Sequence, residues 1–341
     1  MENLLYLIFV LLLTNFLFLK NIAFIEKKYD LFDRPDEIRK RQLNPVPLLG
    51  GLLFIINLSI FLFFDYFLSS KFFFYSLGFI GEINILIFCI TLIFVFLIGF
   101  LDDKIKIKPF TKLVLLSVVL YVVFLINPKI VINSLNFSFY DPPIDLFGLG
   151  ILFSILCVVT YVNALNMLDG INLISGIYYL SIITMFSLYN FQISFVAMFL
   201  IFSIFFIFLN LRGKIYLGDS GVYIISFLIS LLIINLYEKN NLHIENIFLL
   251  MFLPAVDFFR LIVTRIFNRK HPFEADENHF HHLIVKNYDK KKILILLFFI
   301  FLPALLDFFL NINVYIIILF MILSYYLTLK KINSKNNLSL K

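Results

Sequence analysis

Residues 83–103 read INILIFCITLIFVFLIGFLDD, an uncharged apolar run that ends directly in Asp102 and Asp103. A helix needs about 20 apolar residues to cross a bilayer, and this run is long enough. The two acids then lie at the height of the lipid headgroups, where a divalent cation or a phosphate-bearing lipid can reach them. Paired acids after an apolar helix also occur as solvated markers of topology, and these two residues alone leave both interpretations open.

The composition of the whole chain is that of a polytopic membrane protein. Its 341 residues are 62% hydrophobic and 15% charged, with a mean hydropathy of +0.99, far from soluble globular averages. Both cysteines, Cys89 and Cys157, lie in apolar runs, which argues against a disulfide framework or a thiolate metal site. The net charge of +6 does not indicate nucleic-acid binding, because the basic residues lie in short loops rather than in one patch.

Apolar runs of this kind recur along the chain and predict an all-α fold with ten or eleven transmembrane helices in a single membrane domain, residues 1–341. The first run lacks the basic start and the cleavage site of a signal peptide and is expected to be a retained span. Two runs, residues 173–189 and 193–209, are short and closely joined, which leaves the number of spans open. The eleven runs begin near Leu4, Leu48, Ile83, Leu113, Phe147, Leu173, Ile193, Val222, Ile247, Ile293 and Val314.

The distribution of charge predicts which side of the membrane each connection faces. With eleven spans, six segments share one side, and they hold 23 of the 28 Lys and Arg residues. The positive-inside rule puts them in the cytoplasm and the N-terminus outside. On the other side, the loop around Asp141, Pro142 and Pro143 is expected to be a simple turn. The six segments are 26–47, 102–112, 163–172, 210–221, 265–292 and the tail from 330.

Two of these segments combine charges with features that suit phosphate groups. Residues 33–41 read DRPDEIRKR, and Gly50 and Gly51 follow shortly after. The basic residues suit an anionic headgroup, although a purely topological role is equally open, and the paired glycines predict a close backbone approach. The next segment sets Asp102 and Asp103 beside four lysines that include Lys112, a combination suited to phosphoryl transfer.

The third and fourth segments carry polar residues at the ends of spans. In residues 163–172, NALNMLDGIN, the three-residue spacing places Asn163, Asn166 and Asp169 on one helix face. Hydrogen bonding between helices is the alternative explanation for them. In residues 216–221, YLGDSG, the glycines predict a tight turn, and Asp219 is expected to cap the helix that follows.

The fifth segment, residues 271–282, reads HPFEADENHFHH and holds four of the five histidines. Such a cluster predicts contact with a polyphosphate or a metal. Zinc is an option, but the nearby acids and the absence of thiolates favour phosphate.

These five segments, in this order, resemble the motifs of the polyprenyl-phosphate N-acetylhexosamine-1-phosphate transferases of glycosyltransferase family 4, which start bacterial cell-envelope glycans on undecaprenyl phosphate. The resemblance covers residues 33–282, and further helices follow in residues 293–330. Residues 278–282, NHFHH, are more similar to the enterobacterial-antigen and teichoic-acid initiating enzymes than to the muramoyl-pentapeptide branch. The resemblance implies that the protein lies in the bacterial inner membrane and that a UDP-N-acetylamino sugar donates the sugar 1-phosphate.

The resemblance also implies a role for each matching residue. Asp102 and Asp103 match the acidic pair at the lipid phosphate, and Lys112 matches a phosphate-side lysine. Asn166 and Asp219 match ligands of Mg²⁺ or Mn²⁺. The remaining matches, on the nucleotide, diphosphate and sugar, are Asp169, Asn172, Asn210, Tyr216, His279, His281 and His282.

Three positions depart from the family pattern. Lys106 stands where many members have a third acid, Asn172 where they have Asp, and Gln42 where they have His. Because Asn172 is neither a base nor a nucleophile, a covalent intermediate there is disfavoured. An inactive homologue and a lipid-linked sugar flippase are the alternatives to a transferase. The sequence leaves open the sugar, the glycan pathway, the effect of Lys106 and Asn172 on activity, and whether the chain forms a homodimer.

Overall fold

The computed structural model describes residues 2–34, 44–189, 191–240, 242–270, 278–288, 292–310 and 312–338. Gln42 and His271, singled out from the sequence, lie outside these ranges. The helices are α1 Glu2–Lys20, α2 Ile22–Tyr29, α3 Gly50–Leu68, α4 Phe72–Ser76, α5 Glu82–Ile105, α6 Pro109–Ile126, α7 Gly150–Leu168, α8 Ile174–Leu188, α9 Ile193–Leu211, α10 Gly218–Asn240, α11 Ile244–Leu250, α12 Phe252–Phe267, α13 Phe280–Asn287, α14 Lys292–Phe309 and α15 Val314–Leu338, with a short 3-10 helix at Pro128–Ile130.

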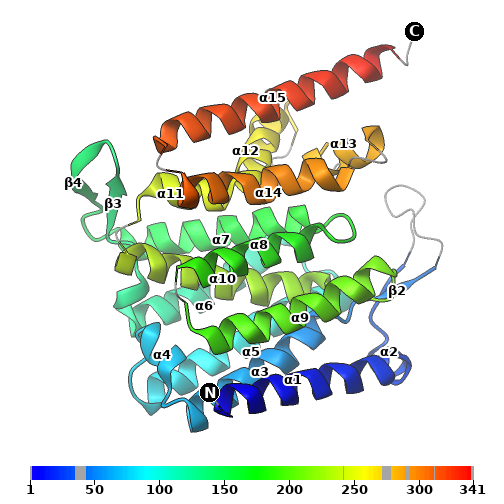
Figure 1. The fold of residues 1–341 in the computed structure, drawn as a ribbon, viewed down its shortest axis with the longest axis vertical. Coiled ribbons are helices and arrows are strands. Elements are labelled where there is room, and N and C mark those ends of the chain that lie inside the picture. Colours follow the sequence, from blue (N-terminus) through cyan, green and yellow to red (C-terminus); the bar gives the residue numbers. More distant parts are fainter. Residues whose placement is uncertain are drawn as a thin grey trace.

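The predicted all-α membrane fold is confirmed. In the described part of the chain nine helices are long and apolar enough to cross a membrane, and a bent pair, α11 with α12, raises the number to ten. The shorter apolar helix α8 coincides with the sixth predicted run. Each of the eleven runs therefore contains a helix, and the long helices lie side by side in Figure 1.

The ninth predicted run is not one straight helix. It breaks after Leu250, and α11 and α12 meet at 89°. Pro254 lies in the first turn of α12. Because proline has no backbone N–H, it cannot donate to the carbonyl of Leu250, and a continuous helix through this point would lose that bond. The second half of the run, α12, therefore points in a different direction from the first half, α11.

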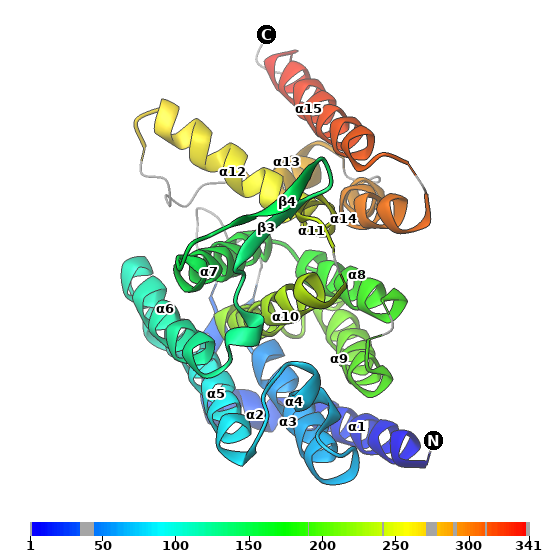
Figure 2. The same ribbon diagram turned by 90° about the vertical axis from the view of Figure 1, so that its left-hand side faces the viewer.

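Helix α10 lies at the centre of the bundle. Its apolar window is entirely buried, and α3, α5 and α7 pack against it, as the end-on view of Figure 2 shows. Outer helices such as α1 and α6 expose leucine, valine and aromatic side chains instead, which is the pattern expected of surfaces that face lipid chains.

Glycines let α3 and α5 approach the start of α10 at backbone distance. A Cβ atom on Gly51 would lie 2.4 Å from the amide nitrogen of Gly221, and one on Gly99 would lie 2.5 Å from that of Ser220. The amide of Gly51 also donates to the carbonyl of Leu217 at 2.9 Å. The close approach predicted from the paired glycines is confirmed.

Two antiparallel pairs of strands complete the fold: β1 Phe32–Asp33 with β2 Val46–Pro47, and β3 Ser134–Phe137 with β4 Tyr140–Asp145. The second pair corrects the expectation of a simple turn at residues 141–143, which belong to β4. Tyr237 of α10 anchors this hairpin, since its hydroxyl accepts from the amide of Asn136 at 2.7 Å. The prolines are tolerated because β4 is an edge strand.

Candidate functional site

Two acidic helix ends meet at one ammonium group. Lys112, in the first turn of α6, lies 2.5 Å from a carboxylate oxygen of Asp102 in the last turn of α5. Its Nζ also lies 3.4 Å from Asp219 in the first turn of α10. The side chains of Lys112 and Asp102 are largely buried. The second oxygen of Asp102 accepts from the amide of Ile107 at 2.7 Å.

Asp103 has a different place from its neighbour. Its two carboxylate oxygens accept from the amides of Asp219 at 2.7 Å and Ser220 at 3.1 Å. It therefore caps the N-terminus of α10 from another helix, where free N–H groups and the helix dipole favour a negative charge. The prediction that Asp219 is the cap was wrong, because the Asp219 side chain faces Lys112 and Asp103 satisfies the amides.

The turn between α5 and α6 sets this geometry. Lys106 ends α5 in a left-handed conformation, with φ of 51°, and its amide donates to the Asp102 carbonyl at 3.0 Å. Pro109 then starts α6, a position that suits its fixed φ. The side chain of Lys106 is exposed. The departure from the family pattern at this position therefore falls on the outside of the turn.

Asp169 follows the last residue of α7 and adds a further carboxylate. Burial, with the charges of Asp103 and Asp33 nearby, raises its pKa to about 7. Acidic side chains are thus concentrated at the ends of α5, α7 and α10. Asn166 lies one turn before Asp169, in a helix that packs against α10. No contact recorded in the described ranges joins Asn166 to Asp219.

Asn210 ties the third segment to the fourth. Its carbonyl oxygen Oδ1 accepts from the amide of Leu173 at 2.7 Å, and its Nδ2 donates to the carbonyl of Ile215 at 3.0 Å. Asn172 donates to the backbone of Asn210 at 3.3 Å and hydrogen-bonds the Tyr216 side chain. These three predicted residues are brought together, and the recorded bonds of Asn210 are structural.

The histidines lie against the end of α7. His279 precedes α13, and His281 and His282 lie in its first turn. A Cβ atom on Gly170 would lie 2.7 Å from Nε2 of His281 and 2.9 Å from Nε2 of His282, so both imidazoles touch the residue after Asp169. Burial and the neighbouring His282 ring hold the pKa of His281 well below its usual value, and this imidazole is neutral at pH 7.

Sequence reasoning missed Asp257. This buried residue of α12 pairs with Arg260 at 2.7 Å and lies 3.1 Å from Nδ1 of His279. A signal was present, because an acid and a base three residues apart in an otherwise apolar run mark a paired intramembrane site.

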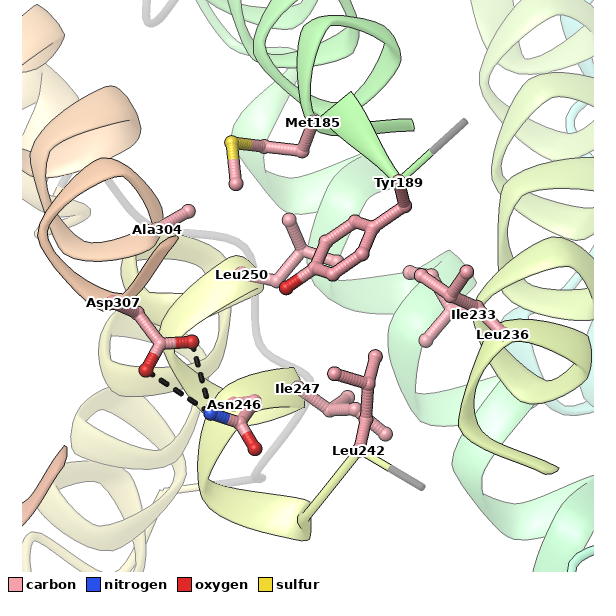
Figure 3. A pocket seen from close by; sticks show the side chains of 10 residues that line it. All are labelled: Met185, Tyr189, Ile233, Leu236, Leu242, Asn246, Ile247, Leu250, Ala304 and Asp307. Atoms are coloured by element: carbon pink, nitrogen blue, oxygen red, sulfur yellow. Dashed lines mark hydrogen bonds between the residues drawn. The ribbon is translucent and has the colours of Figure 1, made fainter. Parts of the chain in front are cut away.

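A small cavity at the opposite end of the bundle is too small for a substrate and lies too far from the acidic helix ends to belong to the same site. Figure 3 shows Asn246 donating to both carboxylate oxygens of Asp307, each at 3.0 Å, beside Tyr189. The cavity volume is about 10 Å³, room for one water at most. Its lining residue Leu236 lies in α10, seventeen residues after Asp219 and thus about 25 Å away along the helix.

The chain is similar in sequence to known proteins. Residues 85–237 match the model of a family described as Glycosyl transferase family 4. This range runs from α5 to α10 and includes the acidic helix ends. The family resemblance predicted from the motifs is thereby confirmed.

Several curated proteins described as "Undecaprenyl-phosphate alpha-N-acetylglucosaminyl 1-phosphate transferase" share similarity over most of the chain, and three of them are compared below. The protein of Salmonella typhi is 26% identical over 81% of this chain and 76% of its own length. That of Escherichia coli (strain K12) is 27% identical over 77% and 71%. That of Thermotoga maritima is 28% identical over 81% and 80%.

Proposed function

We propose that this protein transfers an N-acetylamino-sugar 1-phosphate from a UDP-sugar to undecaprenyl phosphate and releases UMP. The observation that carries the proposal is the meeting of Asp102 and Asp219 at Lys112, at the ends of spans within the range that matches the family model. The names of the curated relatives supply the acceptor. The reaction is the initiating step of a cell-envelope glycan.

The residues at this centre fit a hard divalent cation. Mg²⁺ prefers carboxylate and amide oxygens and keeps several waters. Asp219 would hold it, together with Asn166, which the family resemblance assigns to the cation. Burial and, to a smaller extent, the nearby carboxylates of Asp103 and Asp33 raise the pKa of Asp169 to about 7, and a cation bound beside these acids would offset their mutual repulsion. When bound, the cation neutralises charge on the donor diphosphate.

The transfer itself is a direct displacement. An oxygen of the lipid phosphate forms a bond to the β-phosphorus of the UDP-sugar, the bond from that phosphorus to the bridging oxygen breaks, and UMP leaves with the bridging oxygen. A phosphate monoester with a second pKa near 6 is already largely ionised at pH 7. Positioning and charge neutralisation therefore contribute more than base strength.

Each group of residues has a part in this displacement. Asp102 and the adjacent Lys112 orient the lipid phosphate, and the ammonium offsets its charge. Asp103 acts through α10, since it fixes the backbone that carries Asp219. Tyr216 stacks on the uracil ring, within the connection that Asn172 and Asn210 hold in place.

The histidine cluster and Asp169 form the remaining wall of the site. His281 and His282 contact Gly170 and from there reach the diphosphate and sugar of the donor. Because His281 is neutral, it serves as a hydrogen-bond partner rather than as a fixed charge.

The protein works in the bacterial inner membrane with these residues on the cytoplasmic side, where UDP-sugars are available, and with its N-terminus outside. The excess of Lys and Arg in the connections at this end supports the orientation. The buried mid-span amides Asn15 and Asn57 bond to each other at 2.6 Å. Such paired groups differ from the polar midplane site that a flippase needs.

Purified protein in detergent, given undecaprenyl phosphate, Mg²⁺ and a panel of UDP-amino sugars, tests the proposal. We expect release of UMP with one donor above the others and its loss in EDTA. No gradient exists in detergent, so UMP release excludes transport as the activity. Absence of UMP with every donor would instead favour a transport or binding role.

A further inference from the structure

Asp257 lies at the centre of a buried network that joins α12, α13 and α15. Its Oδ1 accepts from Nη2 of Arg260 at 2.7 Å and from the hydroxyl of Tyr325 at 2.8 Å. Its Oδ2 lies 3.1 Å from Nδ1 of His279. The amide of Phe280 donates to both oxygens, at 3.1 and 3.2 Å. The carboxylate is therefore held from several directions before it meets the imidazole.

This network fixes the backbone of His279 as well as its ring. Nη2 of Arg260 also donates to the carbonyl of Asn278 at 2.6 Å, directly before the histidine. Because a carboxylate accepts hydrogen bonds, the nitrogen that faces it, Nδ1, is the one that carries a proton. The other nitrogen, Nε2, is left for a partner outside the network.

The fixed ring belongs to the wall of the proposed site. His279 stacks on His281 with ring centroids 5.4 Å apart and lies edge-on to His282 at 6.3 Å. Both of these rings contact Gly170, next to Asp169. A change in the orientation of His279 would therefore displace His281 and His282 where they contact the end of α7.

A metal site is the competing explanation. Asp257, His279 and His281 offer ligand atoms within 4.8 Å of one another. The guanidinium of Arg260, however, already occupies Oδ1 of the carboxylate. With its oxygens occupied by three further donors, Asp257 is better suited to orient an imidazole than to bind a metal.

We propose that Asp257 is the positioning residue of His279 in the transfer reaction. It holds Nδ1 in the protonated state and presents Nε2 to the donor diphosphate. Its charge stabilises the imidazolium that forms when Nε2 takes up a proton from solvent, and this imidazolium then donates a hydrogen bond from Nε2 to a phosphate oxygen. This assignment rests on the proposed sugar-1-phosphate transfer. It makes Asp257 necessary for activity although it touches no reacting atom.

A double-mutant cycle on UMP release tests the assignment. Asp257→Asn, which preserves shape, should lower kcat about 10- to 100-fold, the loss that follows removal of carboxylates that orient histidines elsewhere. In a His279→Gln background the same change should have almost no further effect. Equal losses in both backgrounds would mean that Asp257 supports the fold alone and would overturn the proposal.

The matched control is Tyr325→Phe, which removes one donor to the same carboxylate and does not alter the contact with His279. The hydroxyl of Tyr325 also accepts from Nε of Arg260 at 2.9 Å. We still expect the change to lower kcat less than about threefold, because the carboxylate keeps its bonds from Arg260, Phe280 and His279. A loss as large as that of Asp257→Asn would show that general packing of the network is responsible.

A readout independent of turnover separates failure of this proposal from failure of the function. In protein labelled with ¹⁵N-histidine, the His279 signals, identified by their absence in His279→Gln, should report protonated Nδ1 in the wild type and lose that preference in Asp257→Asn. An unchanged spectrum would overturn the assignment even if no UMP is released. A transition metal retained by purified wild type and lost from Asp257→Asn would overturn it in favour of a metal site.

Discussion

At the scale of single residues, Lys112 is the point where the acidic helix ends meet. Its ammonium contacts both Asp102 and Asp219. Without it, two partly buried carboxylates would face each other uncompensated, which is costly. Asp103 differs from its neighbour although the two are adjacent in sequence, because its oxygens are taken by the amides of α10.

Lys112→Met should therefore lower UMP release by about 100-fold or more, in the range seen when one stabilising donor of a charged transition state is removed. Lys104→Met, an exposed lysine in the last turn of α5, serves as the control and should leave activity near that of the wild type. Comparable losses in the two variants would show that charge near the membrane surface matters, and that the contact with the carboxylates does not.

The pKa of Asp169 gives a prediction for stability against pH. The folded protein keeps this proton up to about pH 7, whereas an unfolded chain loses it near pH 4. Unfolding between these values releases a proton, so stability falls as the pH rises from about 4 to about 7 and then levels off. In EDTA, the Tm advantage of Asp169→Asn over the wild type should grow between pH 5 and pH 7. Parallel Tm curves for the two proteins would contradict the raised pKa.

At the scale of elements, the site depends on how closely α3 and α5 approach α10. The Cβ of an alanine at position 99 would stand 2.5 Å from backbone atoms of Ser220, and the backbone cannot yield without moving Asp219. Overpacking of this kind costs about 1–3 kcal/mol.

Gly99→Ala should accordingly lower both Tm and UMP release. The control is Leu101→Ala on the same helix, since Leu101 is 45% exposed and its truncation leaves the α5–α10 contact intact. If Gly99→Ala matched the control in both measurements, the close approach of the two helices would not be needed for the site.

Sequence patterns predicted these elements unevenly. Every apolar run contains a helix. The thickness of the bilayer sets the number of consecutive apolar residues that a spanning helix needs, and this number can be counted in the sequence. The break between α11 and α12 comes shortly before Pro254, whereas the continuous apolar run around this proline predicted a single helix. The hairpin of β3 and β4 was missed because it depends on contacts to Tyr237 and Glu245, which are distant in sequence.

The same limit applies to the site. Residue types pointed to Asp102 and Lys112, and the family resemblance added Asp219; the fold does bring these three residues together. Which acid caps α10 could not be predicted, since that depends on how two helices face each other. Asp257 joins His279 across 22 residues, and proximity of that kind is set by the packing of α12 against the helices after it.

At the scale of the whole molecule, the proposed orientation predicts which loops are accessible from outside. In a background with Cys89→Ala and Cys157→Ala, a membrane-impermeant maleimide should label Phe139→Cys, at an exposed residue of the hairpin, in intact spheroplasts. Lys214→Cys, at an exposed residue before α10, should react only after lysis. Labelling of Lys214→Cys in intact spheroplasts would reverse the orientation.

The central claim is that the acidic centre at the ends of α5 and α10 transfers a sugar 1-phosphate with the help of a divalent cation. The most direct measurement compares UMP release from undecaprenyl phosphate and the preferred UDP-sugar by the wild type, Asp219→Ala and the control Asp145→Ala, whose residue is exposed on β4. We predict Mg²⁺-dependent release by the wild type and the control, and none by folded Asp219→Ala. Full activity of Asp219→Ala would contradict the account.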